Sequence, residues 1–294
     1  MYCRAGLRVL ITGLVSVLST VALAEQSTNR QDLSKAEELY RRTEFESSAL
    51  LLNKKSNDGP TNFLLGRNYF MMSDFGKAAE RFLKAVAAEP QNSEYMDWLG
   101  RAYGRRAETS NPFIAPGLAS KARQAFEKSV ELNPSNKEAL SDLFDYYLEA
   151  PGFLGGGYDK AEKVARQMAA IDPPEGHFAL ARLSEKRKEF GSAEQSLRRA
   201  VAIAPHEVGL MVNLAKFLAK QGRTSESDAI FAQAVKTAPD SPSLWFARAD
   251  ALIQQKRNLA EARGLLQKYV KAPITVDDPP KIEAIRLLKQ IGGA

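Results

Sequence analysis

The sequence predicts an all-α solenoid, in which helix pairs stack side by side and share one continuous hydrophobic core. Apolar residues recur at helical spacing along most of the chain, and a unit of about 34 residues repeats several times. Glycine or proline stands near the end of most expected helices, where the chain must turn. Because each repeat contacts only its neighbours, these observations predict one elongated array rather than separate domains.

The clearest unit spans residues 208–241 and is expected to form two amphipathic helices joined by a tight turn. The first helix carries an apolar stripe at helical spacing, formed by Met211, Leu214, Ala215 and Leu218. Gly222 suits the left-handed backbone conformation that ends a helix. The second helix carries Phe231 and Ala234 and ends before Pro239, which cannot continue a helix.

This unit resembles the tetratricopeptide repeat family. The shared residues are Leu214, Ala215, Leu218, Phe231, Ala234 and Pro239, with Ser227 at the family's small position. Residues 59–92 match the family's spacing through Leu65, Gly66, Tyr69, Ala78, Phe82, Ala85 and Pro90. The resemblance extends over residues 30–292. It implies a right-handed superhelix of about six repeats with a capping helix. It also implies a binding surface rather than a reaction.

The first 24 residues have the pattern of a secretory signal peptide. Arg4 and Arg8 provide a basic start, an apolar run continues to Leu23, and cleavage is expected after Ala24. The alternative is an uncleaved membrane anchor, but the apolar run is shorter than the roughly 20 residues that span a bilayer. We therefore expect an exported protein, with the bacterial periplasm favoured over secretion to the outside.

The composition of the mature chain excludes several classes of function. The single cysteine, Cys3, leaves with the signal, so neither disulfides nor thiol chemistry are expected. Removing Arg4 and Arg8 lowers the formal charge from +6 to +4, which is too small for a nucleic-acid-binding surface. No membrane-spanning segment is expected after cleavage.

The repeat pattern divides the mature chain into a series of helix pairs. We expect a divergent N-terminal pair at residues 29–57 and a capping helix at 278–292, preceded by an acidic and proline-rich turn. Between them we expect six repeats, at 59–92, 93–136, 137–173, 174–207, 208–241 and 242–273.

Two of these repeats carry enlarged turns. In the second repeat, the prolines and glycine within residues 105–120 are expected to prevent a regular helix. Phe113 and Ile114 are expected to pack on the neighbouring turn, with docking into another protein as the alternative. In the third repeat, residues 151–157 are expected to form a tightly folded connection. The alternative is an exposed loop that presents Phe153 and Leu154 to a partner, or its backbone amides to an anion.

The sequence offers little that could support catalysis. Gly155, Gly156 and Gly157 precede a helix, but the preceding strand and the Gly-Lys-Ser/Thr ending of a phosphate loop are missing. Histidine occurs only at positions 177 and 206, and no nucleophile elbow is present. We therefore expect no enzyme activity, no metal site and no cofactor.

The resemblance implies that the first helix of each repeat lines a concave groove, with the residue after the Leu-Gly or Leu-Ala pair pointing inward. These inward positions, together with those one turn further on, hold Arg67, Arg101, Arg105, Asp145, Arg182, Lys186, Lys216, Lys220 and Asp250. Such a groove would suit a carboxylate or an acidic peptide. The alternative is a solvated face whose cations form salt bridges with Asp97, Asp142 and Glu185.

Aromatic residues fall near the same face, namely Phe63, Phe70, Trp98, Phe178 and Phe246. Core packing is the favoured interpretation for most of them, and apolar binding pockets are the alternative. The basic residues do not reproduce the lysine and asparagine set with which related co-chaperones hold a terminal carboxylate.

These observations predict an exported, non-catalytic scaffold that binds a protein or peptide segment, acidic in character, in its concave groove within the cell envelope. The alternative is a ligand-binding or assembly accessory subunit of an envelope transporter, in which the two enlarged turns shape a subunit interface. An enzyme, or a lid associated with one, ranks last.

Overall fold

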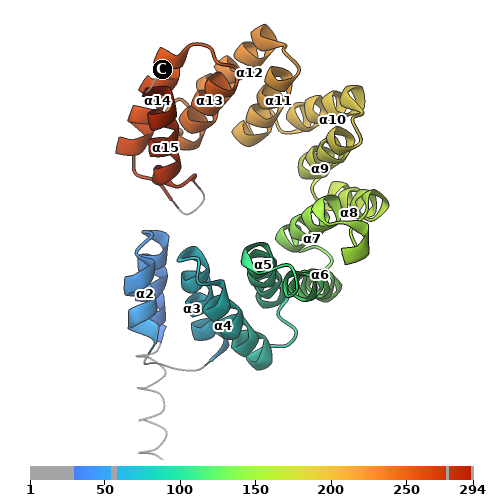
Figure 1. The fold of residues 1–294 in the computed structure, drawn as a ribbon, viewed down its shortest axis with the longest axis vertical. Coiled ribbons are helices and arrows are strands. Elements are labelled where there is room, and N and C mark those ends of the chain that lie inside the picture. Colours follow the sequence, from blue (N-terminus) through green and yellow to red (C-terminus); the bar gives the residue numbers. More distant parts are fainter. Residues whose placement is uncertain (1–29, 54–57, 276–277, 293–294) are drawn as a thin grey trace, which may run out of the picture.

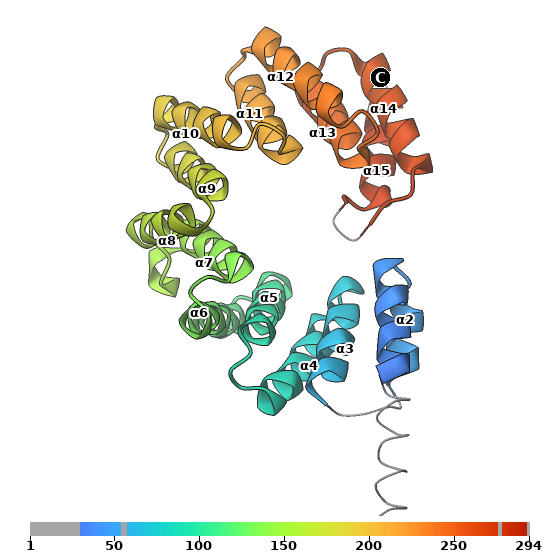
Figure 2. The same ribbon diagram turned by 180° about the vertical axis from the view of Figure 1, so that it is seen from behind.

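The structure is a computed structural model that describes residues 30–53, 58–275 and 278–292. All regular structure in these ranges is helical, as predicted, and the helices follow one another around an open arc (Figure 1). The expected signal peptide, residues 1–24, lies outside the described residues. Seen from behind, the same arc brings α2 (Phe45–Leu52) and α15 (Lys281–Gly292) to opposite sides of its opening (Figure 2).

Two rows of helices make up the arc. The inner row consists of α3 (Gly59–Met71), α5 (Ser93–Thr109), α7 (Lys137–Glu149), α9 (Pro173–Lys186), α11 (Val208–Lys220) and α13 (Pro242–Gln254). The outer row consists of α4 (Phe75–Ala88), α6 (Ala115–Leu132), α8 (Tyr158–Ile171), α10 (Phe190–Ile203), α12 (Thr224–Thr237) and α14 (Leu259–Lys271). Residues 30–41 are also helical and pair with α2.

Local sequence signals explain where the inner helices begin. The side chains of Asp58, Asn92 and Asn136 each accept a hydrogen bond from a backbone amide in the first turn of the following helix. Such caps satisfy amides that have no partner within the helix. Proline stands in the first turn of α3, α9 and α13, where its missing N–H costs nothing.

A left-handed residue closes the tight turn between the two helices of several repeats. It is Ser73 between α3 and α4, Lys188 between α9 and α10, and Gly222 between α11 and α12, with φ of 62°, 61° and 75°. Only glycine adopts this conformation without strain. The turn is therefore set by the packing of the two helices, and the glycine that marked it in residues 208–241 is not required in every repeat.

Small residues allow the two helices of a repeat to approach closely. A Cβ atom added to Gly66 would stand 2.5 Å from the ring of Phe82, and one added to Gly100 would stand 2.6 Å from the ring of Phe126. Each glycine lies on an inner helix and each ring on the outer helix of the same repeat. These contacts build the continuous hydrophobic core that the sequence predicted.

The first enlarged turn differs from its prediction. Helix α5 continues to Thr109 and α6 begins at Ala115, so the irregular stretch is confined to residues 110–114 and is shorter than the expected 105–120. Pro116 falls in the first turn of α6, where proline is tolerated. Phe113 is 96% exposed and Ile114 is 53% exposed, so the expected packing of these two side chains on the neighbouring turn is wrong.

The second enlarged turn is compact, as predicted. Residues Gly152–Leu154 form a single 3-10 turn, η1, and Tyr146 Oη donates a hydrogen bond of 2.8 Å to the carbonyl of Leu154. A Cβ atom on Gly156 would stand 1.8 Å from the carbonyl oxygen of Ala150, so glycine is required there. Phe153 remains 83% exposed at the tip.

Candidate functional site: the charged inner surface

Ion pairs join consecutive inner helices along the arc. Arg101 of α5 pairs with Asp142 of α7, and Arg182 of α9 pairs with Asp145 of α7. The other pairs are Lys186 with Glu149 at 2.6 Å, Lys216 with Asp250 at 3.3 Å, and Lys220 with Glu185 at 3.9 Å. The salt bridges expected under the solvated-face interpretation are therefore present. The cations belong to α5, α9 and α11, and most of their partners belong to α7 and α13.

Helix α7 supplies acids to both of its neighbours. Glu138, Asp142, Asp145 and Glu149 follow one another at intervals of four, three and four residues, which places them on one face of the helix. Sequence reasoning noted Asp142 and Asp145 but missed Glu138 and Glu149. Their spacing, read along the chain, would have revealed an acidic inner helix between two basic ones.

Arg67 differs from the other predicted groove residues because its guanidinium group lies against aromatic rings. Its guanidinium carbon lies 4.4 Å, 5.7 Å and 5.1 Å from the ring centroids of Tyr40, Phe63 and Trp98. Its Nε donates no hydrogen bond to the described part of the chain. Stacking on aromatic faces is favourable for arginine. Arg67 therefore packs the N-terminal helix pair against α3 and α5.

Arg101 stands among three carboxylates. Besides Asp142, it approaches Asp97 at 3.2 Å and Glu138 at 3.3 Å. Burial and the nearby charge of Asp142 raise the pKa of Asp97 to about 8. Burial also raises the pKa of Glu94, one turn before Asp97. Sequence reasoning treated Asp97 only as a salt-bridge partner of Arg101 and gave no sign that it is buried.

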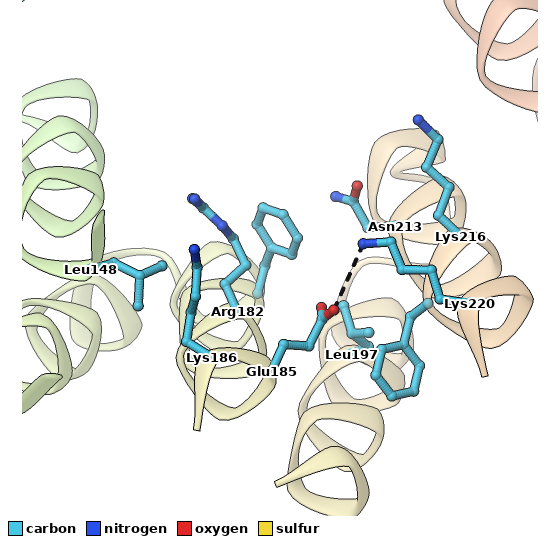
Figure 3. Close-up of a pocket in the computed structure, with 10 residues that line it drawn as sticks. Leu148, Arg182, Glu185, Lys186, Leu197, Asn213, Lys216 and Lys220 are labelled. Carbon is cyan, nitrogen blue, oxygen red and sulfur yellow. Dashed lines mark ion pairs between the residues drawn. The ribbon is translucent and has the colours of Figure 1, made fainter. Parts of the chain in front are cut away.

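A basic pocket of about 410 Å³ lies between α9 and α11. Its cations are Arg182, Lys186, Lys216 and Lys220, and Glu185 is its one acidic lining residue among those described. Arg182 and Lys186 extend from α9 in the same direction, whereas Lys220 reaches back from α11 toward Glu185 (Figure 3). The carboxylates that pair with the other three cations belong to α7 and α13, outside the lining. The predicted groove residues thus converge most closely here.

A second, more apolar pocket of about 440 Å³ lies where the two enlarged turns meet. Ala119 of α6 and Leu154 of η1 line it together with Phe126 and Tyr146. Arg101, Arg105 and Asp145 also line it, and Arg105 is further engaged by Glu108 and the ring of Phe75. These three predicted groove residues therefore line a different pocket from the four at the basic pocket, and the Asp145–Arg182 ion pair joins the two sets.

The aromatic residues divide between core and pocket. Phe63 and Trp98 are buried and contact each other edge to face, and Phe82 joins them, as core packing predicted. Phe178 lines the basic pocket and Phe70 lines the apolar one. Phe246 packs on Tyr269.

The residues that the structure describes contain no cluster of three or more His, Cys, Asp or Glu side chains arranged to hold a metal ion. Within the same part of the chain, no helix is both long and apolar enough to cross a lipid bilayer.

Comparison with known proteins agrees with this architecture. The profile of the tetratricopeptide repeat matches residues 185–247, which include α10, α11 and α12. A solved tetratricopeptide repeat protein from Parabacteroides merdae is similar in fold, with a TM-score of 0.60 and 14% identity over 90% of this chain and 99% of that one. Residues 185–247 are therefore tetratricopeptide repeat sequence, and the chain has the fold of a solved tetratricopeptide repeat protein.

Two curated relatives are much longer than this chain. The BBSome complex member BBS4 of Bos taurus is 23% identical over 72% of the chain, and the cellulose synthase 1 operon protein C of Komagataeibacter xylinus is 27% identical over 86% of it. The chain spans 38% and 18% of their respective lengths. The similarity supports a protein-interaction scaffold in general terms.

Proposed function

We propose that the protein is an exported, non-catalytic scaffold that binds an acidic protein segment along the inner surface of its arc, within the cell envelope. The observation that supports this best is the basic pocket between α9 and α11, where two basic helices are neighbours and four cations line one hollow. Export rests on the signal-peptide pattern of the first 24 residues.

The basic pocket can exchange its present partners for those of a ligand. Lys186 is 42% exposed and Lys220 is 63% exposed, and ion pairs at such exposure contribute at most about 1 kcal/mol. A carboxylate that enters the pocket would therefore meet ammonium groups that are only weakly held. Phe178 and Leu197 provide an apolar floor for the attached chain.

The test is charge reversal of two pocket lysines, Lys186→Glu together with Lys220→Glu. Binding of a fluorescein-labelled hexaglutamate peptide should weaken by about tenfold or more, because repulsion replaces attraction at both positions. The matched control reverses two exposed lysines of the outer row, Lys84→Glu and Lys236→Glu, and has the same net charge change. Circular dichroism should show unchanged helix content in both variants.

Equal loss of binding in the two double variants would point to non-specific charge attraction and would contradict a site at this pocket. A second experiment captures partners from an envelope fraction and identifies them by mass spectrometry, and it compares the unmodified protein with the pocket variant. A partner retained by the control and lost by the pocket variant is the expected result.

The apolar pocket favours a second candidate function, that of a ligand-binding or assembly accessory subunit of an envelope transporter. Both enlarged turns contribute to this pocket, which is large enough for a small molecule. Native mass spectrometry should then detect a bound small molecule that Ala119→Trp removes. Light scattering should also show a stable oligomer, and a bare monomer would count against this candidate.

A further inference from the structure

The two enlarged turns leave the arc on the same side. First-turn residues of α5 and α7, Glu94 and Glu138, line one pocket together, and last-turn residues of the same helices, Glu108 and Glu149, line another. The two helices therefore run parallel, and the turns that follow them start from the same edge of the arc.

The second enlarged turn also packs against the helix that follows the first one. Leu154 of η1 and Ala119 of α6 line the apolar pocket together. A Cβ atom added to Gly155 would stand 2.9 Å from Cδ of Arg123, which is also on α6. The two turns are therefore neighbours, and we call the surface formed by residues 110–114 and 150–158 the turn edge.

The turn edge exposes large apolar side chains. Phe113 and Phe153, one on each turn, are the two most exposed large apolar residues of the described chain. Ile114 lies next to Phe113 in the sequence, and Tyr158, which is 42% exposed, begins α8 directly after the second turn. Exposed apolar residues that gather on one surface mark a site of interaction.

Basic side chains without acidic partners accompany these apolar tips. Arg106 is in the last turn of α5, Lys121 is on α6 and Lys160 is in the first turn of α8. None of the three forms an ion pair within the described ranges, where Lys121 lies over the ring of Tyr103 and Lys160 donates to the carbonyl of Gly155.

The acids that flank the same turns already have cationic partners. Glu108 pairs with Arg105, and Asp159 lies 3.6 Å from Arg187. Glu149, the last residue of α7, pairs with Lys186. The charge that the turn edge offers to a partner is therefore positive.

We propose that the turn edge docks on the surface of an anionic lipid bilayer. Phe113, Ile114 and Phe153 enter the boundary between headgroups and acyl chains, where their apolar surface is removed from water. Tyr158 has an apolar ring and a polar tip, which suits the same depth. Lys121 and Lys160 meet the lipid phosphates. The proposal depends on neither the basic pocket nor the apolar one.

Charge favours a lipid surface over a second copy of the chain at this edge. Two copies that met through their turn edges would bring the same unpaired cations face to face, and like charges across an interface are unfavourable. A bilayer that contains anionic lipid instead supplies negative charge across the whole edge.

The experiment measures co-sedimentation of the full mature chain with vesicles that contain about 30% phosphatidylglycerol in phosphatidylcholine. Binding should be about tenfold weaker to pure phosphatidylcholine vesicles and should decrease at high salt, because salt screens exposed charges. Equal binding to both kinds of vesicle would contradict the role of the cations. Absence of binding to either would overturn the proposal.

The double variant Phe113→Ser with Phe153→Ser tests the apolar tips. Both side chains are exposed, so circular dichroism should be unchanged, whereas vesicle binding should weaken by about tenfold or more. The matched control is Leu50→Ser with Ile282→Ser, which removes apolar side chains that are 73% and 70% exposed on α2 and α15. Equal loss in both double variants would contradict a site at the turn edge.

A second double variant, Lys121→Gln with Lys160→Gln, tests the cations. Binding to the anionic vesicles should weaken by about tenfold, because each lysine near the surface adds to the attraction. Lys84→Gln with Lys236→Gln makes the same charge change on the outer row and should alter binding by less than about twofold. Similar losses in the two variants would show that only net charge matters and would overturn the assigned edge.

The variant Phe153→Trp reports where the tip lies in the bound state. The native Trp98 and Trp245 are buried, so a shift of the emission to shorter wavelength on addition of vesicles would come from the new indole. An unshifted emission from vesicle-bound protein would contradict insertion of the tip. A dimer in the absence of vesicles that Phe113→Ser with Phe153→Ser dissociates would assign the turn edge to a second copy instead.

Discussion

At the step from α5 to α7, one arginine contacts three carboxylates, and the innermost of them is buried. At the step from α9 to α11, four cations line an open pocket with a single glutamate. Both steps use the same helix register, and both belong to the inner row. The difference comes from neighbouring sequence, since α7 is acidic and α11 is basic. One fold can therefore present opposite charges a few repeats apart, and burial decides which charges affect stability.

The comparison predicts that the free energy of unfolding depends strongly on pH because of the α5–α7 step, and not because of the α9–α11 step. The folded pKa of Asp97, about 8, is above its unfolded value of 3.8, so the folded state holds a proton that the unfolded state releases between these values. The free energy of unfolding should therefore fall by about 3–5 kcal/mol as pH rises from 4 to 8.

Urea denaturation at several pH values measures this effect. Asp97→Asn should remove most of the slope, whereas Glu185→Gln should leave it as in the unmodified chain. A slope that survives in Asp97→Asn would show that another group is responsible.

The close contact of the inner-helix glycine should also make the α5 repeat more sensitive to substitution than the α11 repeat. Gly100→Ala should lower the free energy of unfolding by about 2 kcal/mol, because the new methyl group would overlap the ring of Phe126. At α11 the equivalent position already holds Ala215, which packs in the same core cluster as Phe231. Gly104→Ala, on α5 but with open space around it, should instead be neutral or stabilising by about 0.5 kcal/mol. Thermal denaturation of the two variants provides the comparison.

Arg101 and Lys216 occupy equivalent positions, and their removal should have unequal effects. Arg101→Gln should destabilise by about 1.5 kcal/mol at pH 7, because it leaves Asp142, Glu138 and any ionised Asp97 without their shared cation. Lys216→Gln breaks one partly exposed pair and should cost less than about 1 kcal/mol. Equal losses in denaturant titrations would contradict the distinction between the two steps.

The smallest effect on stability is expected at the rim of the basic pocket. Lys220→Gln should change the free energy of unfolding by less than about 0.5 kcal/mol, since its pair with Glu185 is long and exposed. The same substitution should still weaken binding of the hexaglutamate peptide by a measurable factor. A large loss of stability here would mean that this pair is structural and is not available to a ligand.

The fold was predictable because hydrophobic spacing reports it directly. Gly66 and Phe82 occur at a spacing that a helix pair brings together, and the ring of Phe82 does lie against Gly66 in the structure. The first enlarged turn is shorter than predicted because Pro116 was taken as a helix breaker. The effect of proline depends on its place in the helix, and Pro116 lies in a first turn.

The candidate site was predictable only in part. The register identified the cations that line the basic pocket, because position on a helix follows from spacing. It could not reveal that Arg67 lies against Tyr40 and Trp98, or that Asp97 is almost completely buried beside Arg101, since both depend on packing between repeats. The acidic face of α7 was visible in the spacing of its carboxylates and was overlooked.

The ion pairs between successive inner helices add polar bridges to the core contacts between repeats. A ligand carboxylate that attracts Lys186 and Lys220 would draw them away from Glu149 and Glu185, and would loosen two such bridges at once. Occupancy of the pocket would then reduce the curvature of the superhelix and make the molecule more extended. Small-angle X-ray scattering with and without hexaglutamate should detect an increase in the radius of gyration. An unchanged value would show that the superhelix keeps its curvature when the pocket is occupied.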